Sequence, residues 1–188
     1  MDDTTAREAV VNAADRLFYA RGIQAVGMDA IRTEAGIPLK RMYALFPSKE
    51  TILAEVLRRR NEVWTSGILR AADDRPTPED KLLSIFDFLS DWFAQDDFRG
   101  CAFINSFGEL GASAPLVGDA ARAHKLGFQR YVAGLAAEAG APPSLAPQIA
   151  LLAEGAQTTA AISGSADAAA DAKAAAATLI GAAAARRD

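Results

Sequence analysis

The spacing of apolar residues along this chain predicts helices and no strands. Residues 5–20 carry apolar side chains at helical intervals, namely Val10, Ala14, Leu17 and Phe18. Two shorter helices are expected over residues 28–35 and from Pro38 to about residue 46, and Gly36 permits a sharp turn between them. The side chains expected to face inward are Met28, Ile31, Ala35, Met42, Leu45 and Phe46. Two short helices around a tight turn form a helix-turn-helix.

Further helices follow at similar intervals. Ser48 is a good N-cap for a long helix, and Thr77 with Pro78 starts the next one. The apolar stripe expected on the long helix is Ile52, Leu53, Val56, Leu57, Val63 and Trp64. The remaining helices are expected at 101–111, 115–140, 148–163 and from Gly164 to about Arg187. The fold class is therefore all-α with about nine helices, divided into an N-terminal helix-turn-helix domain (1–47) and a C-terminal helical domain (48–188).

Composition and charge distinguish the N-terminal part of the chain from the rest. The chain has 188 residues, is 51% hydrophobic and carries a net charge of −4. Residues 1–60 hold 10 basic and 8 acidic side chains, whereas residues 61–188 hold 10 and 16. This asymmetry indicates an N-terminal region that faces a polyanion. The acidic N-terminus, the lone Cys101 and the lack of a spanning apolar stretch predict a cytoplasmic protein with no membrane segment.

A small group of donors stands out in the second short helix and just beyond it. Lys40 and Arg41 lie near that helix's start, where a basic side chain can reach guanine O6 and N7 or a phosphate. Tyr43 can donate to a phosphate, and Lys49 adds charge at the next helix N-terminus. From charge and spacing alone these residues could equally be a solvated surface.

The motifs of this region resolve that choice. The stretches "AADRLFYARG", "GMDAIRTEAGIP" and "MYALFPSKETIL" occur in the order and spacing of the N-terminal DNA-binding domain of the TetR (tetracycline repressor-like) transcriptional regulators, which residues 5–60 closely resemble. The resemblance implies base contacts from Lys40 and Arg41 and phosphate contacts from Tyr43 and Lys49. It further implies a backbone N–H to phosphate from Gly27 or Met28 and a thymine-methyl contact from Ala44.

Two positions depart from the family pattern. Pro38 stands where a Ser or Thr usually caps the recognition helix, which removes a side-chain cap worth about 1 kcal/mol. Arg32 stands where a small Ala is usual, so the packing or tilt of the second helix could differ. An altered helix-turn-helix leaves open an alternative function, that of a helical ligand-binding or interaction protein that no longer reads DNA.

In this family a variable C-terminal domain binds a small-molecule effector and dimerises. The aromatic and polar side chains that could line an effector pocket here are Phe88, Trp92, Phe103, Phe107, Phe128, Cys101, Asn105, His124 and Gln157. The aromatics could instead simply fill a core, and a single histidine is more often a structural residue. The effector's identity does not follow from the sequence.

The last two helices are rich in small residues at helical spacing. These are Ile149, Leu152, Ala153, Ala156 and Ala160, followed by Ala168, Ala172, Ala175, Ala176, Leu179 and Ala183. Two such helices per chain could pair with a second copy as a four-helix bundle and so form a homodimer. The alternative is that the alanine-rich tail is a weakly packed single helix. A dimer would set two recognition helices about 34 Å apart on a near-palindromic operator.

An enzymatic function is not expected. Cys101 and His124 could form a thiol–imidazole pair, but nothing in the sequence indicates that they meet, and no nucleotide-binding or zinc-protease motif occurs. We therefore predict no catalytic site, metal or cofactor. The sequence predicts a homodimeric DNA-binding regulator, most simply a repressor that a ligand releases from double-stranded DNA.

Overall fold

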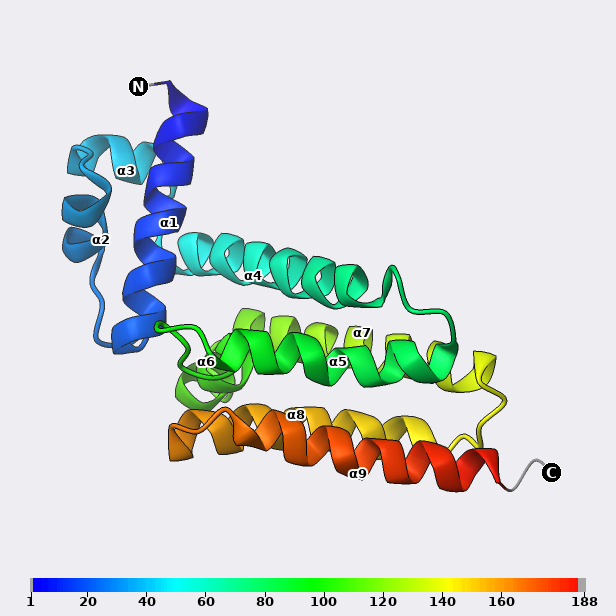
Figure 1. The fold of residues 1–188 in the computed structure, drawn as a ribbon. Helices are drawn as coiled ribbons and strands as arrows, with labels where there is room; N and C mark the ends of the chain where they lie inside the picture. Colours follow the sequence, from blue (N-terminus) through cyan, green and yellow to red (C-terminus); the bar gives the residue numbers. More distant parts are fainter. Residues whose placement is uncertain (1, 186–188) are drawn as a thin grey trace. The chain divides into compact units, whose positions relative to one another are not determined.

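The computed structural model describes residues 2–185, and these form nine helices (Figure 1). They are α1 (Asp3–Arg21), α2 (Met28–Ala35), α3 (Leu39–Leu45), α4 (Lys49–Ala72), α5 (Pro78–Phe93), α6 (Ala102–Leu110), α7 (Pro115–Glu138), α8 (Leu145–Ser163) and α9 (Asp167–Ala184). No strand occurs among the described residues. The all-α fold with an N-terminal helix-turn-helix is confirmed.

The helices pack into two compact units that do not follow the expected boundary at residue 47. The first unit contains Met1–Glu62 and Ala102–Arg122, and the second contains Val63–Cys101 and Ala123–Asp188. Helix α4 and helix α7 each contribute one part to each unit. The division 1–47 and 48–188 stays a prediction about function, because compactness alone does not say which residues act on DNA.

In the first unit, α1 packs against α2 and α3, and α2 packs against α3. Helix α1 begins at Asp3, before the expected Thr5, because the Asp2 carboxylate caps it by accepting from the Thr5 backbone N–H at 2.8 Å. All four apolar residues predicted for its inner face are buried.

The turn between α2 and α3 follows the sequence signals with one change. Gly36 adopts the left-handed conformation (φ 66°, ψ 32°) that ends α2. Pro38 is the N-cap of α3 and not its first helical residue, since its backbone is extended at φ −64° and ψ 143°. Its carbonyl accepts from the N–H groups of Arg41 and Met42 at 3.0 Å, so the helix starts without a side-chain cap.

Fewer side chains of α2 and α3 are buried than the spacing predicted. Met42, Phe46 and Ile31 are buried as predicted. Met28, Ala35 and Leu45 are only half-buried. A helix of two turns has room for few inward positions, so α2 contributes a single fully buried side chain to the core.

Helix α4 starts where Ser48 predicts, because the Ser48 hydroxyl accepts from the Thr51 N–H at 3.3 Å. Thr77 caps α5 in the same way by accepting from the Asp80 N–H at 3.1 Å. The expected stripe on α4 is wrong at Val63, which is 63% exposed, whereas Ile68 is buried. Ile68 lies four residues after Trp64 and continues the buried stripe, whereas Val63 lies beside it on the exposed side.

In the second unit α5, α8 and α9 pack against one another. Helix α8 begins at Leu145 rather than the expected Gln148, because Pro147 falls in the first turn, where a missing N–H costs nothing. Its small residues Ala153, Ala156 and Ala160 are buried together with Ala172 and Ala176 of α9. Small side chains let these helices approach closely, so the alanine-rich tail is a packed helix.

The C-terminal limit of α9 was expected near Arg187, which lies outside the described residues. The last helical residue is Ala184. Among the described helices, none has both the length and the apolar character needed to cross a bilayer.

Candidate nucleic-acid interface and effector site

Helix α3 presents its predicted DNA contacts on an exposed face. Met42 is fully buried and anchors the opposite face to the core. Lys40 and Ala44 are exposed, and Tyr43 is 47% exposed. Lys40 lies three residues before Tyr43 and four before Ala44, so it shares one side of this short helix with both. The arrangement places an ammonium, a phenol and a methyl group on one accessible surface.

Arg41 differs from Lys40 because it already has an acidic partner. Its guanidinium donates to the carboxylate of Asp3 in α1, with Nη2 and Oδ1 3.0 Å apart. Asp3 is highly exposed, and such a surface ion pair is worth only about 0–1 kcal/mol. A phosphate or guanine could therefore take over the guanidinium at little cost.

The N-terminus of α2 is a second feature suited to an anion. Gly27 is its N-cap in extended conformation, and no side chain caps the helix. Uncapped N–H groups at a helix start attract a phosphate through both hydrogen bonding and the helix dipole. Arg32, the departure from the family pattern, donates to Asp29 on the same helix at 2.7 Å. The larger side chain is therefore accommodated on the surface of α2.

Lys49 has a role that the sequence did not reveal. Its ammonium donates to the backbone carbonyls of Ile23 and Val26 at 2.9 and 3.0 Å, in the turn between α1 and α2. An ammonium has three N–H groups, so at most one remains for a phosphate. The phosphate contact stays a prediction, whereas support of the turn is what the geometry shows.

We expect Lys49→Met to lower the free energy of unfolding by about 1–2 kcal/mol, because two backbone carbonyls lose a charged donor. Urea denaturation followed by far-UV circular dichroism measures this. Lys40→Met is the matched control, since it removes an exposed ammonium and should change stability by less than about 0.5 kcal/mol. Equal stability of the two variants would contradict the supporting role.

In the second unit an aromatic cluster forms around Trp64 of α4. The Trp64 ring meets Phe88, His124 and Phe128 edge-on, at centroid distances of 6.2, 4.8 and 5.0 Å. Trp92 stacks on Phe88 at 6.3 Å. The structure thus brings together four of the predicted effector residues. Trp64 was not among the predicted effector residues, because its spacing on α4 indicated only a core position.

Two polar atoms of this unit are buried without a hydrogen-bond partner among the described residues. They are the indole Nε1 of Trp64, a donor, and the Oε1 of Gln157, an acceptor. Gln157 is 1% exposed, and its amide nitrogen donates to the Ala153 carbonyl at 3.2 Å. An unmet buried polar group costs about 1–3 kcal/mol. Both atoms could be satisfied by a polar group of an effector.

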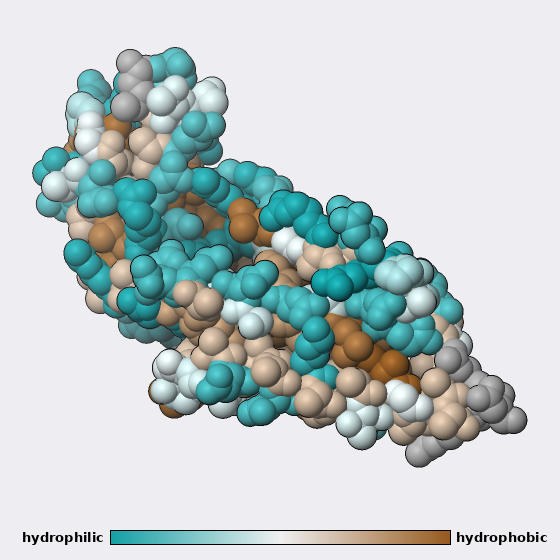
Figure 2. Space-filling view, in the orientation of Figure 1, coloured by the Kyte–Doolittle hydropathy of each residue, from teal (hydrophilic) through white to brown (hydrophobic). Residues whose placement is uncertain are grey.

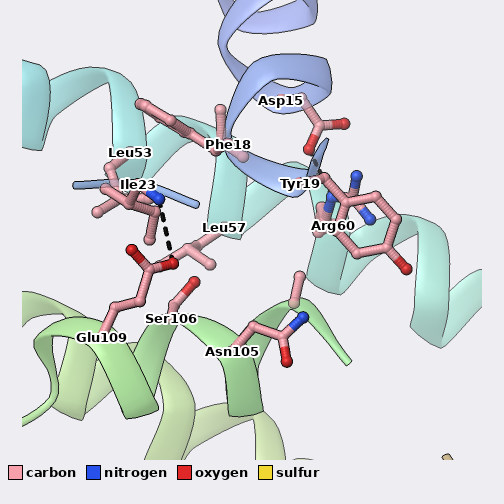
Figure 3. A pocket seen from close by; sticks show the side chains of 12 residues that line it. Asp15, Phe18, Tyr19, Ile23, Leu53, Leu57, Arg60, Asn105, Ser106 and Glu109 are labelled. Carbon is pink, nitrogen blue, oxygen red and sulfur yellow. Dashed lines mark hydrogen bonds and ion pairs between the residues drawn. The ribbon is translucent and has the colours of Figure 1, made fainter. Parts of the chain in front are cut away.

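The remaining predicted effector residues are distributed differently. Phe103, Asn105 and Phe107 belong to the first unit, where Phe103 is buried and Phe107 is half exposed. Asn105 lines a small cavity of that unit (Figure 3) with a volume of about 30 Å³. This volume suits water rather than an organic molecule. Cys101 is buried in the second unit, with its sulfur 3.9 Å from the ammonium of Lys125.

His124 is neutral at physiological pH. Burial, with a smaller contribution from the positive charge of Lys125, lowers the pKa of its imidazole from 6.5 to about 4. The aromatic cluster around Trp64 therefore carries no formal charge at pH 7. Aromatic side chains without a formal charge favour contact with apolar or aromatic groups and disfavour an unpaired ion.

Comparison with known proteins agrees with this architecture. Residues 10–56 match the family model of bacterial regulatory proteins of the tetR family. The HTH-type transcriptional regulator YjdC of Escherichia coli strain K12 is 30% identical over 101 residues. The matched segment is 52% of this chain and 52% of YjdC, so the match spans about half the length of that relative.

Solved structures share the fold along nearly the whole chain. SCO4454, a TetR-family regulator from Streptomyces coelicolor, has a TM-score of 0.90 over 96% of this chain and 97% of its own, at 23% identity. Sav143 of Streptomyces avermitilis, a candidate TetR regulator, has a TM-score of 0.81 over 95% and 97%, at 29% identity. Both are described as TetR-type transcriptional regulators, the class of protein that the N-terminal motifs predict here. Residues 10–56 thus carry the DNA-binding segment of the tetR family of bacterial regulatory proteins, and the nine described helices have the TetR fold along nearly the whole chain.

Proposed function

We propose that this protein is a homodimeric, sequence-specific DNA-binding repressor that acts in the cytoplasm and leaves its operator when a small molecule binds. The observation that carries the proposal is the exposed face of α3, where Lys40, Tyr43 and Ala44 stand together. The uncapped N-terminus of α2 adds phosphate donors to that face. Side chains of α3 read base edges, and the backbone of α2 fixes the helix on the duplex.

The homodimer forms through α8 and α9, although not through the small residues first expected. Those residues are largely buried within the chain, between α8, α9 and α5. The outer face of α8 instead carries Leu151 and Ile162, which are 72% and 83% exposed. In Figure 2 the visible surface over α8 and α9 is largely pale to tan, with scattered hydrophilic side chains.

Helical spacing aligns these exposed positions into uncharged stripes. On α8 they are Leu151, Gly155, Thr158 and Ile162, and on α9 they are Ala170, Ala174, Ala177 and Gly181. Small and apolar stripes without charge are suited to burial against an identical pair of helices. Such a two-fold arrangement presents two copies of α3 to successive turns of one duplex face.

The effector binds at the aromatic cluster around Trp64. An uncharged molecule with a hydrogen-bond acceptor would satisfy the buried Trp64 indole N–H. For release, the effector must bind the DNA-free conformation more tightly than the DNA-bound one. Activation of transcription by the same DNA contacts is the alternative to repression.

Selection of random-sequence duplexes by the purified protein at physiological salt tests the DNA-binding proposal. Enrichment of two inverted half-sites with centres about one helical turn apart is the expected result. A single half-site would support DNA reading without the dimer. A helical interaction protein that no longer reads DNA would enrich no sequence and would show no steep loss of duplex affinity with salt.

A further inference from the structure

The turn between α1 and α2 is held from outside by a residue far away in the sequence. Glu109, in the last turn of α6, places its carboxylate against the start of this turn (Figure 3). Its two oxygens accept from the backbone N–H groups of Ile23 and Gln24 at 3.1 and 3.0 Å. The Gln24 amide nitrogen donates in return to the Glu109 carbonyl at 3.0 Å.

The sequence of the turn is adapted to this close approach. Gly22 has φ 84°, a conformation that side chains rarely adopt. A Cβ at this position would lie 3.2 Å from both carboxylate oxygens of Glu109. Glycine therefore both ends α1 and leaves room for the carboxylate.

The opposite charge holds the other side of the same turn. Lys49 donates to the carbonyls of Ile23 and Val26, so both backbone polar groups of Ile23 are bound by charged side chains. Charge-assisted hydrogen bonds are shorter and stronger than neutral ones. The side chains of Ile23 and Val26 are also buried, which leaves this turn a single well-defined position.

This turn leads directly into the start of α2. Val26 precedes Gly27, the uncapped N-cap whose helix offers its first N–H groups to a phosphate. A hydrogen bond to phosphate weakens steeply when the donor is displaced or turned away. The Glu109 carboxylate therefore helps to fix the segment from which α2 begins.

We propose that Glu109 is a positioning residue for DNA binding, which transmits the position of α6 to the N-terminus of α2. The inference rests on the proposed function, since it assumes that this face binds DNA. Helix α6 and the turn that Glu109 holds both belong to the first unit. A displacement of α6 that breaks the Glu109 hydrogen bonds would free this turn and, with it, the N-terminus of α2.

Glu109→Gln tests this proposal, because the positioning role and simple electrostatics predict opposite changes in DNA affinity. Loss of a negative charge by itself should strengthen binding to a polyanion. Loss of the positioning contact should instead weaken operator binding by about five- to tenfold, because the amide group cannot accept two N–H donors with both of its atoms. Glu109→Asp keeps the charge but shortens the side chain, and it should weaken binding to a similar extent.

The matched control is Asp119→Asn, which removes one negative charge from the same unit at an exposed i,i+3 pair with Arg122. It should bind operator as tightly as the wild type or slightly more tightly. Hydrogen exchange supplies the readout that a change in overall stability would not produce. The Ile23 and Gln24 amides should lose protection in Glu109→Gln and Glu109→Asp at temperatures where both variants stay folded.

The outcomes separate the two proposals. No sequence-specific binding by the wild type would overturn the proposed function. Specific binding by the wild type, with Glu109→Gln and Glu109→Asp as tight as Asp119→Asn, would overturn the role of Glu109 alone. The slope of log affinity against log salt should stay unchanged in the Glu109 variants, because a backbone N–H releases no counterion charge of its own.

Discussion

The double replacement Lys40→Ala and Arg41→Ala is expected to lower affinity for the selected operator at least about a hundredfold. Each basic side chain that meets a guanine in the major groove contributes about 1–3 kcal/mol of discrimination. The fold should survive, because Lys40 is exposed and the Arg41–Asp3 pair lies at the surface. Fluorescence anisotropy with operator and scrambled duplexes, each at several salt concentrations, measures both specificity and the electrostatic part of binding.

A charge-matched control separates base reading from general attraction. Arg70→Ala with Arg130→Ala removes two exposed positive charges from the second unit. This variant should retain operator affinity within about threefold, since those charges are not on the helix-turn-helix. If the two double variants lose operator affinity equally, α3 does not read the DNA sequence. Lys40 and Arg41 would then act only through their contribution to the net charge.

Local sequence signals predicted the helices because they act within one turn of chain. Thr77 and Ser48 cap their helices by bonding to N–H groups three residues away, and Gly36 adopts the conformation that ends α2. The order of helices could therefore be predicted from the sequence. The predicted start of α8 at Gln148 is wrong, because that prediction placed Pro147 before the helix. A proline breaks a helix in its interior but is tolerated in its first turn, so α8 begins at Leu145.

The candidate site was only partly predictable, because its remaining features depend on contacts between distant residues. Lys49 was expected at DNA from its position at a helix start, yet it bonds to carbonyls more than 20 residues away in the sequence. Glu109 contacts the α1–α2 turn at a separation of 85 or 86 residues. No local pattern in the sequence indicates either contact. The exposure of Tyr43 and Lys40, in contrast, could be predicted from the helical spacing of α3 alone.

The aromatic residues show the same limit. Their types predicted a pocket, but only packing decides which of them meet. Trp64 joins Phe88 and Phe128, while Phe107 lies half exposed in the other unit. Three of the five predicted aromatics, Phe88, Trp92 and Phe128, lie in the cluster around Trp64, which was not itself predicted. Their role in binding an effector stays a prediction.

Acid is expected to destabilise the second unit through His124. Its pKa is about 4 in the folded chain and 6.5 for an ordinary histidine, so between these values the unfolded chain binds the extra proton. The contribution of His124 to stability is therefore unchanged above about pH 6.5 and is lost as the pH falls toward 4. Between pH 7 and pH 4.5 this loss amounts to about 2 kcal/mol.

The variant His124→Phe removes the titrating group while keeping a ring beside Trp64. Urea denaturation at pH 7 and at pH 4.5, followed by far-UV circular dichroism, should show the wild type losing about 2 kcal/mol more than the variant over this interval. Carboxylates that titrate in the same range are common to both chains and cancel in the difference. Equal losses would mean that His124 is protonated in the native state at pH 4.5. The aromatic cluster would then hold a positive charge, which would contradict its proposed role in binding an uncharged effector.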